Sequence, residues 1–125
     1  MTQEDKELLL KDLCGRLPYG IKASYYGTEE ERETWDEIEG ITLDGYVDIG
    51  QYGLPIERIK PYLFPLSSMT EEQSKEYHEL IGGMFGTSAL INFEILEDFF
   101  HKNHFDYRGL IEKGLAIDAT NLNIY

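Results

Sequence analysis

The sequence predicts a single α+β domain: an N-terminal helix, a small antiparallel sheet, then C-terminal helices and a closing strand. Three observations predict this class. Apolar residues recur at helical spacing near the start, short alternating segments surround an Asp-Gly turn, and two helical patterns follow residue 67. The chain has 125 residues and 42% apolar content, which fit one globular domain spanning residues 1–125.

The first helix is predicted over Gln3 to Arg16. Thr2 and Asp5 have the spacing of a capping box, and Pro18 with Gly20 ends the helix. The apolar residues at helical spacing are Leu9, Leu10, Leu13, Cys14 and Leu17. Cys14 lies in this stripe, so it is predicted to be a buried, inert thiol. It is the only cysteine, which excludes an intramolecular disulfide and a cysteine zinc cluster.

Three short antiparallel strands are predicted next. Residues 21–26 alternate apolar and polar side chains, and a second strand covers about Thr34 to Leu43. Asp44-Gly45 is a favoured two-residue hairpin turn, so a third strand follows it. A helix followed by three such strands suggests a small curled sheet, of which an SH3-like barrel is one form.

A proline-rich segment follows the strands. Pro55, Pro61 and Pro65 argue against long regular structure between them. Pro55 fits the first position of a one-turn helix through Arg58. The apolar residues Leu63, Phe64 and Leu66 are predicted to form a strap over the core. The first part of the domain (1–66) therefore holds the helix, the sheet and this strap, and the second part (67–125) is mainly helical.

Two longer helices are predicted in the second part. Thr70 and Gln73 form a capping-box pair that starts a helix from Glu71 to about Ile81. The glycine-rich stretch 82–88 is predicted to be a loop, because it lacks the lysine and the spacing of a phosphate-binding loop. The next helix covers about Ser88 to Lys102. Its many apolar residues predict burial on more than one side, and they are Ala89, Leu90, Phe93, Ile95, Leu96, Phe99 and Phe100.

The last segment, 103–120, predicts a short helix and a strand. Asp106 is a good N-cap for a helix from Tyr107 to Lys113, and Gly114 suits the left-handed position that ends it. Arg108 and Glu112 fall four residues apart and are predicted to pair on that helix. The sequence "LAIDA" then alternates as a closing strand. Tyr107 and Arg108 are also candidate contact residues, because both residue types are common at binding hot spots.

The charge of the chain points to a basic protein partner. The net charge is −13, and the segment 28–48 holds nine acidic residues and one basic residue. Such a chain repels phosphate, so direct nucleic-acid binding is not expected. A solvated acidic surface that serves solubility alone is the simpler alternative. The residues predicted to contact a partner are Glu29, Glu30, Glu31, Glu33, Asp36, Glu37, Tyr107 and Arg108.

A second hypothesis is a metal-binding protein or hydrolase. Glu94, Glu97, His101 and His104 are spaced by three, four and three residues, which places them along one helix face. Imidazole and carboxylate are ligands for zinc or iron. The order is not HExxH, and the polar face of an amphipathic helix gives the same pattern. No catalytic residue and no cofactor are assigned from the sequence.

The expected compartment is the cytoplasm. The N-terminal stretch is acidic and amphipathic, unlike a signal peptide, and no segment approaches the roughly 20 apolar residues that a membrane span needs. No membrane partner is therefore expected.

Three blocks of the sequence resemble a known group of proteins. They are "LLLKDLCGRLPYGIK", "IERIKPYLFPLSSMTEEQ" and "NHFDYRGLIEKGLAIDA". Together they resemble small proteins of gut Bacteroidetes and of their phages and mobile elements, a group for which no activity is established. The resemblance implies a bacterial or phage accessory protein and carries over no site. The leading hypothesis is a non-catalytic interaction protein with an acidic, tyrosine-bearing surface, and a structural or assembly protein is a third alternative.

Overall fold

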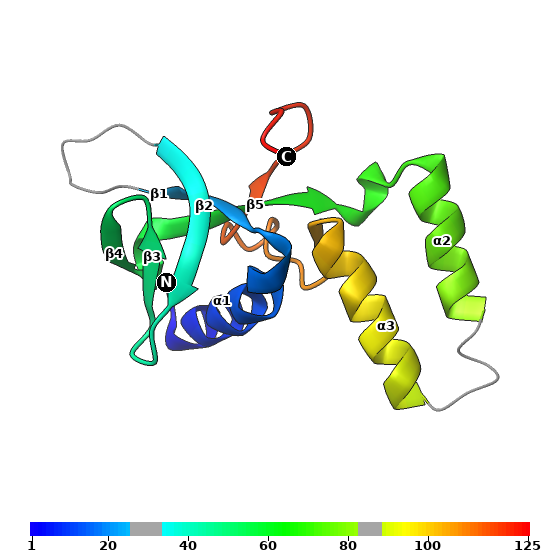
Figure 1. Ribbon diagram of the computed structural model, residues 1–125, viewed down its shortest axis with the longest axis horizontal. Coiled ribbons are helices and arrows are strands. Elements are labelled where there is room, and N and C mark those ends of the chain that lie inside the picture. Colours follow the sequence, from blue (N-terminus) through cyan, green and yellow to red (C-terminus); the bar gives the residue numbers. More distant parts are fainter. Residues whose placement is uncertain (26–33, 83–88) are drawn as a thin grey trace.

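The computed structural model describes residues 1–25, 34–82 and 89–125, with the side chains of 89–92 left out. Figure 1 shows helix α1 against a twisted sheet, and helices α2 and α3 side by side, with the C-terminal end of α3 next to α1 and α2 on the far side of α3. The fold is α+β, as the sequence predicts. Its main elements are α1 (Gln3–Arg16), β1 (Lys22–Tyr25), β2 (Thr34–Ile41), β3 (Tyr46–Ile49), β4 (Tyr52–Pro55), β5 (Ile59–Pro65), α2 (Glu71–Gly82), α3 (Ala89–Lys102), β6 (Phe105–Asp106) and β7 (Ile117–Asp118).

Helix α1 has the predicted bounds and the predicted capping box between Thr2 and Asp5. Its buried side chains are Leu9, Asp12, Leu13 and Arg16. Cys14 is exposed, so the prediction of a buried thiol is wrong. The physical reason is the helical period: successive residues are rotated by about 100°, which turns Cys14 away from the stripe that contains Leu13.

The sheet has the strand order β4-β3-β2-β1-β5-β6, and β7 also pairs with β5. The pairs from β1 to β5 are antiparallel, while β6 and β7 run parallel to β5. Strand β2 pairs with β1 through its first half and with β3 through its second half, with an irregularity between Ile38 and Gly40. This strand order does not test whether the sheet is SH3-like, so that form stays a prediction. Strand β4 has no counterpart in the sequence prediction.

The hairpin between β2 and β3 forms at the predicted Asp44-Gly45 turn. Its loop is closed by hydrogen bonds from the Thr42 N–H to the Tyr46 carbonyl and from the Gly45 N–H to the Thr42 carbonyl, at 2.9 and 3.1 Å. Gly45 has a φ of +84°, which is the left-handed region where glycine is favoured. The loop is therefore a well-defined turn that fixes the backbone from which its side chains extend.

The proline-rich segment corrects the sequence prediction. It is not a strap over the core, because Ile59–Pro65 forms β5, which pairs with strands from both halves of the chain. Leu63 accepts a hydrogen bond from the Ala119 N–H, so the nitrogen of Pro61 faces the same side by the two-residue period. Pairing with β7 begins only at Tyr62. The absence of an N–H group at Pro61 therefore costs no hydrogen bond between the strands. The one-turn helix after Pro55 is present as Ile56–Arg58.

Helices α2 and α3 have nearly the predicted bounds. The Thr70 and Gln73 capping pair forms, with reciprocal hydrogen bonds of 2.9 and 3.1 Å. The predicted burial of α3 on more than one side is confirmed only at its C-terminal end, where the successive residues Phe99, Phe100 and His101 are all buried. It is wrong farther from this end, where Phe93 and Ile95 are exposed.

The segment after α3 also differs from the prediction. Residues 107–114 form turns and no helix, so the predicted helix from Tyr107 to Lys113 is wrong. Gly109 adopts a φ of +73°, which breaks any helix at that position. Asp106 caps the turns instead, accepting the N–H groups of Leu110 and Ile111 at 2.9 Å each. Gly114 is left-handed as predicted, and β7 is the predicted closing strand.

The core lies between α1 and the sheet. It contains Leu9 and Leu13 from α1 together with buried residues of β1 to β5 and Leu110. The opposite side of β5 is covered by the C-terminal segment through Ala119 and Ile124, which pack on Tyr62. Within the described residues, no helix combines the length and the apolar character that crossing a membrane requires.

Candidate functional site

A network of charged and polar side chains joins α1, α3 and the turns after β6. We call this network the polar joint, and its residues are Asp12, Arg16, Glu97, His101, Tyr107 and Arg108. Asp12 lies at its centre and is fully buried. Its carboxylate accepts Nε of Arg16 at 2.7 Å and Nε of Arg108 at 3.1 Å. Arg16 is also fully buried and donates from Nη2 to the Phe105 carbonyl at 2.6 Å.

The hydroxyl of Tyr107 connects the other half of the polar joint. It donates to Oε1 of Glu97 at 3.1 Å and accepts from Nη2 of Arg108 at 3.0 Å. Nε2 of His101 lies 2.9 Å from the same oxygen. A hydroxyl has one proton, so the remaining contact is satisfied when Nε2 of His101 carries its own proton and donates it. The network therefore selects one tautomer of the neutral imidazole.

Burial keeps both ring side chains of the polar joint neutral. Desolvation raises the pKa of Tyr107 to about 12. Desolvation also lowers the pKa of His101, and the nearby charge of Arg16 acts in the same direction. The Tyr107 ring is also held by packing, since it stacks on Phe100 at 4.9 Å between ring centroids. This arrangement serves to fix three segments of the chain against one another.

Sequence reasoning found four members of the polar joint and missed two. Glu97, His101, Tyr107 and Arg108 were all candidate site residues, although two were assigned to a metal set and two to a partner surface. Arg108 pairs with Asp12 and not with Glu112 as predicted, because the expected helix is absent. Asp12 and Arg16 were missed. Their signal was present, since an Asp and an Arg four apart share the buried stripe of α1.

The four side chains predicted as a metal set do not converge. Glu97 and His101 are bound to Tyr107, while Glu94 is exposed on α3. His104 lies past the helix end with a φ of 60°, and its ring stacks on Tyr125 at 3.7 Å. In the ranges that the structure describes, no group of three or more His, Cys, Asp or Glu side chains is placed to hold a metal ion.

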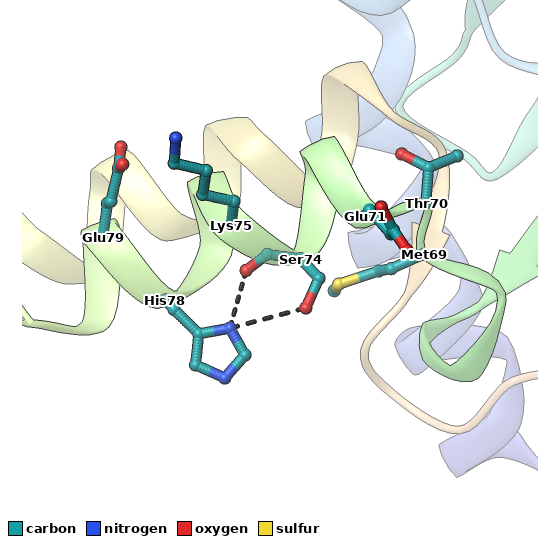
Figure 2. A pocket seen from close by; sticks show the side chains of 7 residues that line it. All are labelled: Met69, Thr70, Glu71, Ser74, Lys75, His78 and Glu79. Atoms are coloured by element: carbon teal, nitrogen blue, oxygen red, sulfur yellow. Dashed lines mark hydrogen bonds between the residues drawn. The ribbon is translucent and has the colours of Figure 1, made fainter.

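A wide hollow of about 730 Å³ lies along α2, and Figure 2 shows its lining side chains. Ser74 and His78 lie on one side of the helix, while Lys75 and Glu79 point away from them. Nδ1 of His78 is 2.6 Å from the Ser74 carbonyl oxygen and 3.5 Å from the Ser74 hydroxyl. The short contact requires a proton on Nδ1, so this nitrogen does not act as a base toward the hydroxyl.

The acidic residues predicted to contact a partner fall into two groups. Glu29, Glu30, Glu31 and Glu33 lie outside the described residues. Asp36 and Glu37 are exposed on β2 and point to opposite faces of the sheet, since they are adjacent in a strand. Glu37 shares its face with Trp35, which is 47% exposed.

The face of β2 and β3 that points away from the core carries the exposed acids and aromatics. We call it the outer sheet face, and its residues are Trp35, Glu37, Tyr46 and Asp48. Asp48 is flanked across the sheet by Gly40 and Gly53, which have no side chains to cover its carboxylate. A Cβ at either glycine would lie only 3.5 Å from an Asp48 oxygen. The fold thus leaves this carboxylate open to solvent.

A lysine already contacts the aromatic part of this face. Nζ of Lys22 lies 5.4 Å from the centroid of the Trp35 ring and 5.6 Å from that of Tyr125. It also donates to the Ile124 carbonyl at 2.9 Å. Such cation–π contacts show that the geometry here accommodates an ammonium group beside an exposed indole.

Comparison with known proteins adds no relative. Searches against family models, curated proteins and solved structures each return no match to this chain.

Proposed function

We propose that this chain is a non-catalytic interaction protein that binds a basic protein partner through its outer sheet face. The observation that carries the proposal is Trp35, which is 47% exposed in a paired strand with Glu37 on the same face. Trp is enriched at interface hot spots, and a strand holds it without the entropy cost of ordering a loop.

Charge supports a basic partner. The net charge of −13 favours encounter with a positively charged surface. Glu37 and Asp48 flank the aromatic residues of the outer sheet face, and Tyr46 adds an amphipathic ring that is 46% exposed. Aromatic rings with nearby carboxylates suit Lys and Arg side chains, which have apolar stems and charged ends. A sharper form of the proposal is mimicry of nucleic acid, in which the carboxylates replace phosphates in the basic groove of a partner.

The test is a tagged capture from bacterial lysate at 50 and 500 mM salt, read by mass spectrometry and repeated with the purified partner. A stoichiometric basic partner should be lost at about 500 mM salt, because many screened charge contacts contribute to binding. The variant Trp35→Ala with Glu37→Gln and Asp48→Asn should weaken binding at least about 30-fold, since hot-spot and charge losses add to at least about 2 kcal/mol.

The matched control changes three acids on helix α2, Glu71→Gln, Glu72→Gln and Glu79→Gln. It removes one negative charge more than the outer-face variant does, but from a different surface. It should change the affinity by less than about threefold. Equal loss in both variants would mean that net charge alone drives binding and would reject the outer sheet face. A second variant with Gln at 29, 30, 31 and 33 tests the remaining acidic segment. Competition by duplex DNA would support the mimicry form.

A further inference from the structure

A groove of about 450 Å³ lies between the first turns of α1 and the β2–β3 hairpin. Figure 1 shows the hairpin loop beside the start of α1. Side chains from three separate segments line this groove, and those used below are Lys6, Glu7, Leu10, Leu43, Asp44, Ile56 and Glu57. It lies at one end of the sheet, next to the Tyr46 end of the outer sheet face.

Leu43 is the most unusual residue at the groove. Its exposure is 107%, so it contributes nothing to the core. The backbone that carries it is nevertheless held in one conformation, because the turn is closed by hydrogen bonds on both sides of Leu43. The Thr42 hydroxyl donates to Oδ1 of Asp44 at 2.7 Å and accepts from the Tyr46 N–H at 3.1 Å. A leucine presented on such a turn is pre-organised to enter an apolar contact with another molecule.

The floor of the groove is apolar and its rim is acidic. Leu10 packs against the core from α1 and is only partly buried, so it offers carbon surface at a fixed position, whereas Ile56 is 5% exposed and closes the floor as part of the core. The rim carries Glu7, Asp44 and Glu57, and its one base is Lys6 among the described lining residues. Nζ of Lys6 is already bound to Glu57 at 2.6 Å, which leaves an excess of negative charge at the rim.

We propose that this groove docks a short segment of the protein partner in which one large apolar side chain is flanked by Lys or Arg. The apolar side chain would contact Leu43 and Leu10, and the flanking bases would face Glu7 and Asp44. This inference rests on the proposed function, because it names what a basic partner inserts beside the outer sheet face. A second copy of the chain fits poorly, since two chains of net charge −13 repel each other.

The test uses a phage-displayed library of random twelve-residue peptides, selected on the full chain at low salt. Enriched peptides are synthesised, and their dissociation constants are measured by fluorescence polarisation at two salt concentrations. The groove variants are Leu43→Ser and Glu7→Gln. Leu122→Ser is the matched control, because this leucine is 47% exposed on the C-terminal segment away from the groove. Leu43 lies outside the core, so its variant should keep the thermal midpoint of the wild type.

The proposal expects enriched peptides that share an apolar residue flanked by bases. Their affinity should fall at least tenfold with Leu43→Ser, about threefold with Glu7→Gln, and less than twofold with Leu122→Ser. Peptides that bind equally to the Leu43→Ser variant would overturn the groove. If those peptides are basic and lose affinity with Trp35→Ala, the proposed function stands while this inference fails. Apolar peptides that lack bases but still need Leu43 would show that the groove binds peptides. They would contradict both the prediction that its ligand is basic and the proposed basic partner. A library that yields no enriched peptide overturns the inference.

Discussion

The two ends of this molecule are built in different ways. The body, formed by α1 and the sheet, has one continuous core in which Leu9, Ile49 and Leu63 are fully buried. The helical hairpin of α2 and α3 has a smaller apolar cluster at its base, around Phe99 and Phe100, and α2 contributes no buried residue in the described range. The difference shows that the hairpin depends on its base for stability, while the body is stable through its own core.

The polar joint lies where the body meets the hairpin. Asp12 and Arg16 come from the body, Glu97 and His101 come from α3, and Arg108 comes from the turns between β6 and β7. Tyr19 adds a contact outside this network, donating from its hydroxyl to Asp98 at 2.9 Å. Directional hydrogen bonds hold the hairpin at one angle, which apolar packing alone specifies less strictly.

The largest expected effect is at the polar joint. Asp12→Ala removes the carboxylate that pairs with two arginines and leaves fully buried Arg16 uncompensated. We expect a loss of about 3–5 kcal/mol in the free energy of unfolding, measured by urea denaturation. Lys11→Ala, at the exposed neighbouring position, should change it by less than about 0.5 kcal/mol. A loss below about 1.5 kcal/mol for Asp12→Ala would show that the network contributes little.

The second prediction compares a leucine of each region. Leu63→Ala in β5 should cost about 2–5 kcal/mol, because the side chain is fully buried and leaves a cavity. Leu80→Ala in α2 should cost about 1 kcal/mol, because its side chain is only partly buried. Hydrogen exchange should likewise show faster opening of α2 amides than of β5 amides. Equal costs would contradict the view that the hairpin depends on its base.

The third prediction uses two helical glycines. A Cβ at Gly15 in α1 would lie 2.8 Å from Cε1 of His101, whereas a Cβ at Gly82 in α2 would meet no atom of the described residues within 4 Å. Gly15→Ala should destabilise the fold by about 1–3 kcal/mol through overpacking of the polar joint. Gly82→Ala should be neutral or stabilise by up to about 1 kcal/mol. Thermal melts of both variants give the comparison, and stabilisation by Gly15→Ala would mean that His101 moves freely.

The smallest expected effect is a change in pH dependence. Burial lowers the pKa of His104 to about 4 from its ordinary value of 6.5. The unfolded chain therefore binds the proton first, so this contribution to stability is complete above pH 6.5 and is lost as the pH falls toward 4. His104→Asn keeps a residue that tolerates the positive φ and should flatten the stability curve in this window. Urea denaturation of the wild type and of the variant across this pH window measures the difference in slope.

The sequence predicted the parts of the fold that depend on local signals. The capping pairs at Thr2 and Thr70 and the Asp44-Gly45 turn act over a few residues, and all three form. The strand β5 was missed because the proline rule considers each proline alone. Whether Pro61 costs a hydrogen bond depends on which neighbour its nitrogen faces, and that is a property of the assembled sheet.

The candidate sites were predicted less well, because they depend on long-range contacts. Glu97 and His101 do share one side of α3, as their spacing indicates, but they bind Tyr107 from a later segment. The pairing of Asp12 with Arg108 spans 96 residues, and no local pattern reports it. The exposure of the Trp35 and Leu43 side chains could not be predicted either, since strand and turn patterns do not give the exposed fraction of a single side chain.

The path of the chain around the hairpin has an evolutionary consequence. The chain leaves the sheet after Pro65 and returns at Phe105, which pairs with Phe64. The two ends of this excursion are therefore neighbours, and the described residues of α2 and α3 take no part in the sheet register. Adding or deleting matched turns of α2 and α3 would leave β5, β6 and the core in place. We infer that this excursion is where descendants of the fold can gain or lose length while keeping the same body.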